Sequence, residues 1–326
     1  MRCLMLSNPN STSLTNDVMR AIIAPLMQVT ELHSQHTHYA GHARDICRGL
    51  SRDDFDLIVA VGGDGTVNEV INGLLGESLQ QRRAPQELPA IAVIPTGSAN
   101  VFARALGFPN DPVAAANMVA ELIAENQYRR LPLGRVENHW FCVNTGFGID
   151  AEVIDRMELL RKKKLKATPG AYLLVAVGAW LRMRRHKPTI SFTAHSDGKT
   201  HTSQQLPVVM VSNTNPWTYA GPLPVILNPG ANVAAGLSLY ALRDIDGPGG
   251  AAALAHALGV GRRRWQLLRI DLREIRVDDI DSLVLTASEP LKWQVDGEAC
   301  GEAKKLDVQS YHDVIDVISP KSNTNL

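Results

Sequence analysis

The stretch that most restricts the fold of this chain is an apolar run that leads directly into a glycine-rich turn. Residues 55–61 read FDLIVAV, which is typical of a strand buried on both faces of a parallel sheet. Gly62, Gly63 and Gly65 follow at once, and a helical pattern continues through Asn68–Leu75. Ligands bind at the carboxyl ends of such strands in open α/β sheets. The sequence therefore predicts an α/β domain with a binding site at this edge.

The first 130 residues alternate between short apolar runs and helical patterns. Predicted strands lie at Arg2–Leu6 and Pro89–Ile94, and predicted helices lie at Asn16–Met27, Val101–Leu106 and Pro112–Ala124. This β-α-β-α order predicts a parallel sheet covered by helices on both faces. We expect residues 1–130 to form an N-terminal domain.

Strand patterns and Gly/Pro-rich turns dominate beyond residue 130. The predicted strands are Arg135–Thr145, Thr189–His195, Leu206–Ser212, Leu237–Leu242, Glu274–Val277, Leu283–Val295 and Val314–Ile318. Two-residue alternation with frequent turns favours an antiparallel, sandwich-like second domain at residues 131–310. The alternative that residues 310–326 return to the first domain stays open.

Length and composition narrow the classes of function. At 326 residues the chain is about twice the length of a domain of roughly 150 residues. Lys+Arg and Asp+Glu both number 33, so no global field favours nucleic acid as a partner. The longest apolar stretch, residues 171–181, has 11 residues against the roughly 20 of a spanning helix. The cysteines are too scattered for a disulfide framework or a zinc site, which favours the cytoplasm; they are Cys3, Cys47, Cys142 and Cys300.

The glycine turn continues as GGDGTVNE over residues 62–69, and these residue types suit a nucleotide. Three glycines in four residues let the backbone approach a phosphate chain, and N–H groups at the helix start are donors in a positive field. Asp64 is of the type that holds Mg²⁺, and Thr66 and Asn68 can donate to phosphate oxygens. The alternative is a tight turn whose glycines serve only the backbone. The fixed order of acid, hydroxyl and amide favours the nucleotide hypothesis.

A second turn follows the next predicted strand and carries Gly97, Ser98 and Asn100. Because parallel strands end at the same edge, we expect these residues beside the first glycine loop. The alternative is that Ser98 or Asn100 caps the helix at Val101–Leu106. Both interpretations can hold, since a capped helix start is also a phosphate site.

Near the other end, the sequence WQVDGE over residues 293–298 sets Asp296 and Glu298 around one glycine. A carboxylate at a strand end suits a general base that takes a proton from an attacking hydroxyl. The alternative is a plain hairpin, because Asp-Gly is a frequent two-residue turn. Taken alone, this motif is better explained by the hairpin.

In this order and spacing, the motifs resemble the diacylglycerol kinase catalytic family of lipid kinases, whose fold and nucleotide loop are shared with NAD kinase. The resemblance covers nearly the whole chain and lies in Asn8-Pro9, THYAGHA at 37–43, GGDGTVNE at 62–69, PTGSANVFARALG at 95–107, NTGFGIDAEV at 144–153 and VDGE at 295–298. It implies an N-terminal ATP domain, a C-terminal β-sandwich domain, an active site in the cleft between them, and phosphorylation of a lipid hydroxyl.

Matching positions give the site residues that the resemblance implies. Glu298 would be the proton acceptor, with Asp296 beside it and Asp64 on the side of the Mg²⁺ that accompanies ATP. The implied ATP contacts are Asn8, Thr37, Gly62, Gly63, Asp64, Gly65, Thr66, Val67, Asn68, Gly97, Ser98 and Asn100. Positioning and charge neutralisation carry most of the catalysis in phosphoryl transfer.

Three positions depart from the family pattern. Ser98 replaces a threonine and keeps the hydroxyl, whereas Val101 replaces an aspartate and cannot bind metal or water. Some bacterial members carry an Asp before a Gly as part of a structural Mg²⁺ site. This chain has Ala235 before Gly236, so we expect that site to be absent.

Two local clusters bear on partners and metals. Between residues 161 and 187 lie nine Lys/Arg and no Asp or Glu, around the apolar AYLLVAVGAWL. Such a segment suits peripheral contact with the inner face of a membrane, and a core helix with solvated flanks is the equal alternative. A homodimer is a further hypothesis.

Four histidines crowd one segment of the sequence; they are His33, His36, His38 and His42. The spacing of His38 and His42 would suit one face of a helix. We interpret all four as surface and loop residues rather than metal ligands.

The sequence thus predicts an ATP- and Mg²⁺-dependent kinase that phosphorylates the hydroxyl of a diacylglycerol-like lipid at the membrane surface. A NAD kinase-like enzyme on a soluble substrate is the first alternative. A catalytically silent lipid or nucleotide sensor, which Val101 favours, is the second.

Overall fold

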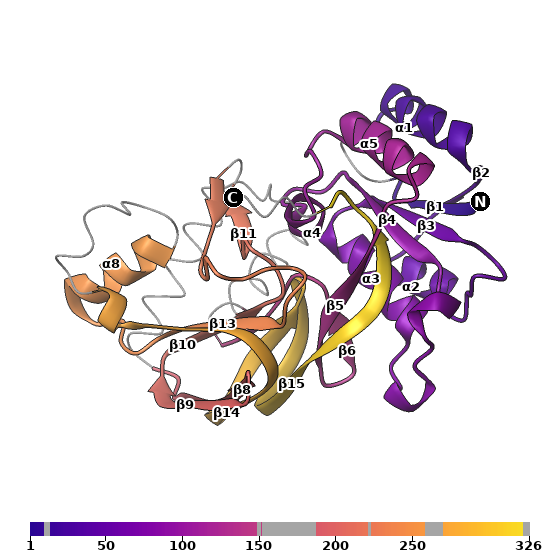
Figure 1. The fold of residues 1–326 in the computed structure, drawn as a ribbon. Coiled ribbons are helices and arrows are strands. Elements are labelled where there is room, and N and C mark those ends of the chain that lie inside the picture. The colour runs from indigo at the N-terminus through magenta and orange to yellow at the C-terminus, as the bar shows by residue number, and fades with distance from the viewer. Residues whose placement is uncertain (10–13, 149–150, 152–186, 221–222, 258–269, 322–326) are drawn as a thin grey trace. The chain divides into compact units, whose positions relative to one another are not determined.

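The computed structural model describes residues 1–9, 14–148, 151, 187–220, 223–257 and 270–321 (Figure 1). The chain divides into two compact units. Unit 1 comprises Met1–Leu133, Asn138–Trp140 and His312–Leu326, and unit 2 comprises Gly134–Glu137 and Phe141–Tyr311. The last residues of the chain therefore belong with the first.

Unit 1 contains a parallel sheet in the order β2-β1-β3-β4. Its strands are β1 (Arg2–Ser7), β2 (Glu31–His36), β3 (Leu57–Gly62) and β4 (Ala90–Pro95), and the end of β15 (Glu298–Ile318) pairs with β4 in parallel. Its helices are α1 (Asn16–Val29), α2 (His42–Cys47), α3 (Asp64–Leu75), α4 (Val101–Ala105) and α5 (Pro112–Ala124), with short turns η1 (Leu79–Gln81) and η2 (Pro85–Glu87). Figure 1 shows α1 and α5 on one face of the sheet and α2 and α3 on the other. The predicted α/β architecture is confirmed.

Local signals explain where these elements lie. Every side chain of β3 and β4 is buried, as expected for unbroken apolar runs. Asp111 accepts a hydrogen bond from Ala114 N at 2.8 Å and precedes Pro112 at the start of α5, which is an ordinary N-cap with proline in the first turn. No apolar pattern marks β2, because its sequence ELHSQH is polar and mostly exposed.

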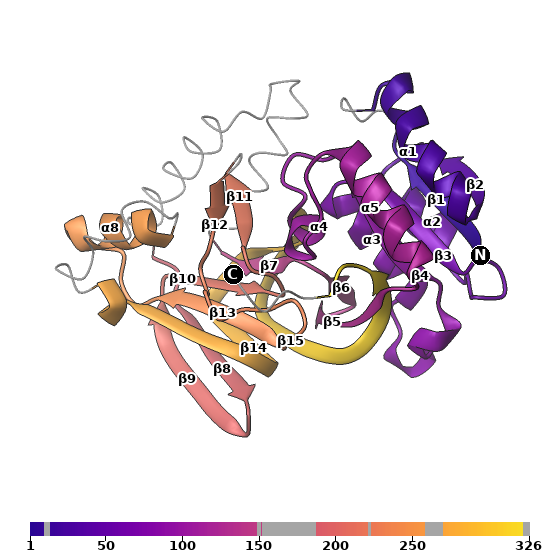
Figure 2. The ribbon, with the colours of Figure 1, turned by 45° about the horizontal axis from the view of Figure 1, so that its top comes forward.

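Unit 2 is built from antiparallel strands, which Figure 2 shows from a second side. Its strands are β7 (Asn144–Phe147), β8 (Ile190–Ser196), β9 (Lys199–Leu206), β10 (Val208–Ser212), β11 (Thr218–Ala220), β12 (Leu223–Val225), β13 (Leu237–Leu242), β14 (Glu274–Val295) and the first part of β15. β5 (Tyr128–Val136) and β6 (His139–Phe141) contribute residues to both units. Among its described residues, the helical elements are α8 (Gly247–Ala257) and η4 (Ile270–Leu272).

Both faces of the β10 strand bury apolar side chains, as the sandwich-like prediction requires. Val209 and Val211 join a cluster with Trp293 of β14, whereas Val208 joins a second cluster with Tyr240 of β13. Because successive side chains of a strand point to opposite faces, this alternation places one apolar cluster on each side of the strand. The antiparallel second domain is confirmed.

Several boundaries differ from those predicted. The single strand expected at Arg135–Thr145 is three strands, since the chain turns at Glu137 with φ +51° and again between β6 and β7. The two strands expected at 274–277 and 283–295 form one strand, β14. The helix α3 begins at Asp64 rather than Asn68.

No helix among the described residues is long and apolar enough to cross a membrane. The basic segment predicted to contact lipid, residues 161–187, lies outside the described residues except for Lys187. Membrane contact and the homodimer stay predictions.

Candidate active site

The two glycine loops of unit 1 lie against each other where β3 and β4 end. Thr96 N donates a hydrogen bond to Gly62 O at 3.0 Å. A Cβ atom built on Gly97 would lie 2.7 Å from Gly63 Cα, a distance at which no side chain fits. The structure thus brings the two predicted loops together, and it needs glycine at position 97 for their contact.

Asp64 caps a neighbouring helix with both of its carboxylate oxygens. Oδ2 accepts a hydrogen bond from Val101 N at 3.0 Å, and Oδ1 accepts one from Phe102 N at 2.9 Å. These are the first N–H groups of α4, which need acceptors from outside the helix. Burial raises the pKa of Asp64, and the hydrogen bonds from Phe102 and Val101 act against that rise. The acid of the first loop therefore fixes the second loop.

The second loop is shaped by Asn100, which is 3% exposed. Asn100 stands at the N-cap position of α4 with φ +50° but makes no side-chain cap, contrary to the capping alternative. Its Oδ1 accepts from Gly97 N at 2.8 Å, and its Nδ2 donates to Gly97 O at 2.9 Å and to Asn110 Oδ1 at 2.8 Å. The side chain of Asn100 therefore holds the turn closed.

Residues 66–68 have different surroundings although they are adjacent on α3. A Cβ on Gly62 would lie 2.4 Å from Thr66 Oγ1, so the threonine packs on that glycine. Val67 is 1% exposed, and Asn68 Nδ2 donates to Trp140 O at 2.9 Å. The backbone at the start of α3, rather than the side chains of Val67 and Asn68, is what this loop presents to a phosphate.

Glu69 was not among the predicted site residues, and it performs for α2 what Asp64 performs for α4. Its Oε1 accepts from Gly41 N at 2.8 Å, and its Oε2 accepts from Ala43 N at 3.0 Å. The two acids of GGDGTVNE thus hold the starts of two different helices beside one loop. In the sequence, the only indication of this role of Glu69 was its position five residues after Asp64.

The remaining predicted ATP residues of unit 1 follow the other two strands. Asn8 comes after β1 and is exposed, and Thr37 comes after β2 and is 8% exposed. Thr37 N donates to Ser7 O at 2.9 Å, which continues the pairing of these strands. The predicted ATP residues therefore follow four neighbouring strands at the carboxyl edge of one sheet, which is where α/β folds bind ligands.

In unit 2, Asp296 and Gly297 form the two-residue turn between β14 and β15. Their φ angles are +46° and +88°, and Val295 pairs with Glu298 across the turn. Positive φ at both central positions is the geometry of a type I′ hairpin, which Asp-Gly favours. The hairpin interpretation of this motif is confirmed.

Asp296 has a second task, because its buried carboxylate organises the loop between β6 and β7. Oδ1 accepts from Val143 N and Asn144 N, each at 2.9 Å. Oδ2 accepts from Cys142 N at 2.9 Å and from Cys142 Sγ at 3.3 Å. A carboxylate that accepts this many hydrogen bonds is held in place. Asp296 therefore acts as an anchor of the hairpin tip.

Glu298 differs from Asp296 in being exposed. It begins β15 directly after the anchored turn, where Gly297 N donates to Gln294 Oε1 at 2.8 Å. Burial and then the negative charge of Glu298 raise the pKa of Cys300 to about 11. Of the two acids in the motif, Glu298 is the one exposed to solvent.

The carboxylates of Asp64 and Glu69 are both engaged by backbone N–H groups. Among the described residues, no three His, Cys, Asp or Glu side chains are grouped so as to hold a metal ion. Magnesium that accompanies ATP is held largely by the phosphates, so it belongs with the substrate.

One departure from the family pattern, Val101, has a local explanation. Val101 is 3% exposed, so this position contributes its backbone N–H to Asp64 and its side chain to the apolar interior. Gly236 N donates to Asp279 Oδ1 at 2.7 Å. His38 precedes α2 and His42 begins it, so the two do not share a helical face.

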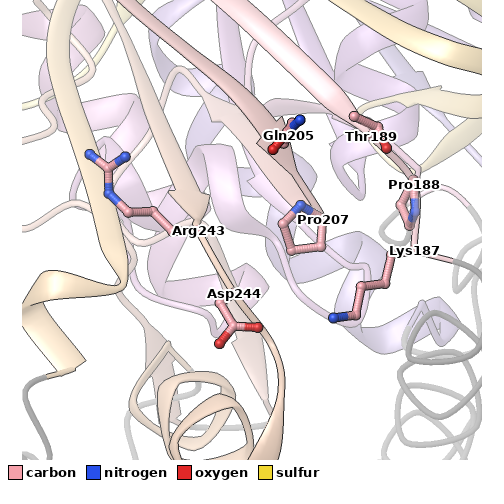
Figure 3. Close-up of a pocket in the computed structure, with 7 residues that line it drawn as sticks. All are labelled: Lys187, Pro188, Thr189, Gln205, Pro207, Arg243 and Asp244. Atoms are coloured by element: carbon pink, nitrogen blue, oxygen red, sulfur yellow. The ribbon is translucent and has the colours of Figure 1, made fainter.

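Unit 2 also contains a cavity of about 260 Å³, shown in Figure 3. Lys187 at its rim is paired with Asp246, and Arg273 Nη1 donates to Asp244 Oδ2 at 2.6 Å. Its lining residues are Lys187, Pro188, Thr189, Gln205, Pro207, Arg243 and Asp244. None of these is a predicted site residue.

The contact between the glycine loops predicts a graded effect of added methyl groups. Gly97→Ala places a Cβ 2.7 Å from Gly63 Cα, and Gly63→Ala places one 3.2 Å from Gly97 Cα. We expect Gly97→Ala to lower the free energy of unfolding by about 1–3 kcal/mol and Gly63→Ala by less. Urea denaturation of both variants measures this, and an equal or reversed order would contradict the packing described.

The raised pKa of Asp64 predicts a pH dependence of stability. A carboxyl whose pKa is higher in the folded state contributes most below its unfolded pKa, 3.8, and the contribution is lost as pH rises through the folded value. The difference in unfolding free energy, wild type minus Asp64→Asn, should therefore fall as the pH rises from 3.8 into the neutral range. Denaturation of both proteins across this range tests the sign, and a difference that grows with pH would contradict burial as the dominant cause.

Comparison with known proteins agrees with this geometry. Residues 2–136 match the family model described as the diacylglycerol kinase catalytic domain. Two solved structures from Bacillus anthracis each cover 98% of this chain and 97% of their own; their TM-scores are 0.72 and 0.67 at 22% and 18% identity. The second is described as a diacylglycerol kinase. The chain has the two-domain α/β and β fold of these structures.

Curated relatives match the N-terminal part of the chain. The diacylglycerol kinase of Bacillus subtilis is 34% identical over 152 residues, which are 45% of this chain and 46% of that protein. A probable lipid kinase YegS-like from Chromohalobacter salexigens is 31% identical over 145 residues, 44% of this chain and 43% of that protein. The chain thus spans about half the length of the curated relatives it matches. Residues 2–136 are therefore similar to the diacylglycerol kinase catalytic domain.

Proposed function

We propose that this chain is an ATP-dependent lipid kinase that transfers the γ-phosphate of MgATP to a hydroxyl of a diacylglycerol-like lipid, giving a phosphatidic-acid-type product. The observation that carries the proposal is the pair of touching glycine loops, Gly62–Gly65 and Gly97–Asn100, at the carboxyl edge of the unit 1 sheet. Names of relatives over the same segment, diacylglycerol kinase and probable lipid kinase, support the substrate class.

Each group has a role in this proposal. The start of α3 and the second loop bind the phosphates through backbone N–H groups, and Asp64 keeps these two loops in register. Glu298 takes the proton from the lipid hydroxyl as its oxygen attacks the γ-phosphorus and ADP leaves. Asp296 holds the turn that carries Glu298.

Incubation of the full chain with [γ-³²P]ATP, Mg²⁺ and mixed micelles containing diacylglycerol tests the proposal, with NAD as a parallel soluble acceptor. Label in the organic phase that comigrates with phosphatidic acid is the expected result. Label on NAD alone would replace the lipid kinase by a NAD kinase-like enzyme. ATP binding without any labelled product would favour the alternative of a catalytically silent lipid or nucleotide sensor.

A further inference from the structure

A stacked aromatic pair lies exposed on the loop that follows β2. The rings of Tyr39 and His42 have centroids 4.4 Å apart and planes 25° apart. Tyr39 is 57% exposed, which is unusual for so large a ring in a globular protein. His42 covers one side of the tyrosine ring, and much of the rest of the ring faces solvent.

Hydrogen bonds fix the orientation of both rings. Tyr39 Oη donates to Asp45 Oδ2 at 3.1 Å, and His42 Nδ1 accepts from His38 N at 3.1 Å. The loop beneath them is held by Glu69 through Gly41 N and Ala43 N. The exposed face of Tyr39 is therefore held in place before any ligand arrives, so its immobilisation costs little on binding.

The position of the pair relates it to the glycine loops. The strand order β2-β1-β3 puts two strand spacings between the end of β2 and the end of β3, which is about 10 Å. Glu69 belongs to the helix that starts at the first glycine loop, so one helix connects that loop to the aromatic pair. The ribose and α-phosphate of a nucleotide can bridge such a distance.

We propose that Tyr39, supported by His42, stacks on the purine base of the nucleotide whose phosphates the glycine loops bind. The proposal rests on the proposed function and adds the base subsite to it. A flat ring with an open face attracts a base through its π-surface, and a purine offers more surface than a pyrimidine. The subsite therefore distinguishes purine from pyrimidine nucleotides.

Titration of the full chain with MgATP and with magnesium tripolyphosphate, which has no base, tests this subsite. Tyr39→Ala should weaken MgATP binding about tenfold, as expected for the loss of one stacked base, and leave tripolyphosphate binding unchanged. Tyr39→Phe keeps the ring and should bind MgATP within about twofold of wild type. Wild type should bind ATP more tightly than UTP, and Tyr39→Ala should narrow that difference.

The outcomes distinguish a failure of the stacking proposal from a failure of the proposed kinase function. MgATP binding that survives intact in Tyr39→Ala would overturn the stacking proposal alone. Equal losses for MgATP and tripolyphosphate would overturn it as well, because they would show that Tyr39 supports the loop. Wild type that binds neither ligand would overturn the proposed function and this subsite together.

Discussion

Glu298→Gln is expected to lower the rate of lipid phosphorylation by about 10²–10⁴-fold while MgATP binding survives. The amide is nearly the same size as the carboxylate but cannot accept a proton, and general-base catalysis accounts for a factor of that order. Glu298 is exposed at the start of β15, outside the buried network of Asp296. Its replacement should therefore leave the fold intact.

The measurement is kcat with saturating lipid, together with MgATP affinity by calorimetry. Glu302→Gln is the matched control, since Glu302 is also exposed on β15 and only four residues away. We expect the control to keep wild-type turnover. Wild-type turnover by Glu298→Gln would remove it as the base, and loss of MgATP binding in that variant would show that Glu298 acts on the nucleotide instead.

The architecture was predictable because its strongest signals are local. The apolar runs of β3 and β4 and the capped, proline-started α5 each determine an element within a few residues. β2 had no such signal, since it pairs with β1 through its backbone while its side chains stay polar. An element defined by backbone pairing alone leaves no apolar pattern to read.

The sequence showed which residue types the glycine loops contain, but it did not show which groups their side chains contact. Asp64 and Glu69 look like ligands for a metal or a phosphate in a linear motif. Each nevertheless accepts hydrogen bonds from a helix start that lies 26–38 residues away in sequence. Only the tertiary fold reveals which N–H groups a carboxylate meets. The preference of helix starts for acceptors made such contacts possible, but no spacing rule locates them.

Two Asp-Gly turns in this chain show the same limit. Asp197-Gly198 joins β8 to β9, and Asp296-Gly297 joins β14 to β15, each with positive φ at both positions. Asp197 is exposed, whereas the carboxylate of Asp296 is buried among the N–H groups of residues 142–144. The dipeptide predicts the turn in both cases, and the surroundings alone decide which aspartate also anchors another loop.

That difference yields a controlled prediction. Asp296→Asn keeps a residue that tolerates positive φ but replaces one acceptor oxygen by an NH₂ group that faces backbone donors. We expect the free energy of unfolding to fall by about 2–4 kcal/mol, because buried N–H groups lose their acceptor. Asp197→Asn makes the same substitution in the same kind of turn and should change it by no more than about 0.5 kcal/mol.

Kinase activity should fall with stability in Asp296→Asn, since the turn that presents Glu298 is no longer held to the loop at 142–144. Urea denaturation of both variants gives the free energies, and the lipid kinase assay at a temperature where each protein is folded gives kcat. Equal stability of the two variants would refute the anchoring role of Asp296. Lost activity with unchanged stability would show that the carboxylate of Asp296 serves the reaction, either directly or by positioning Glu298, rather than the stability of the fold.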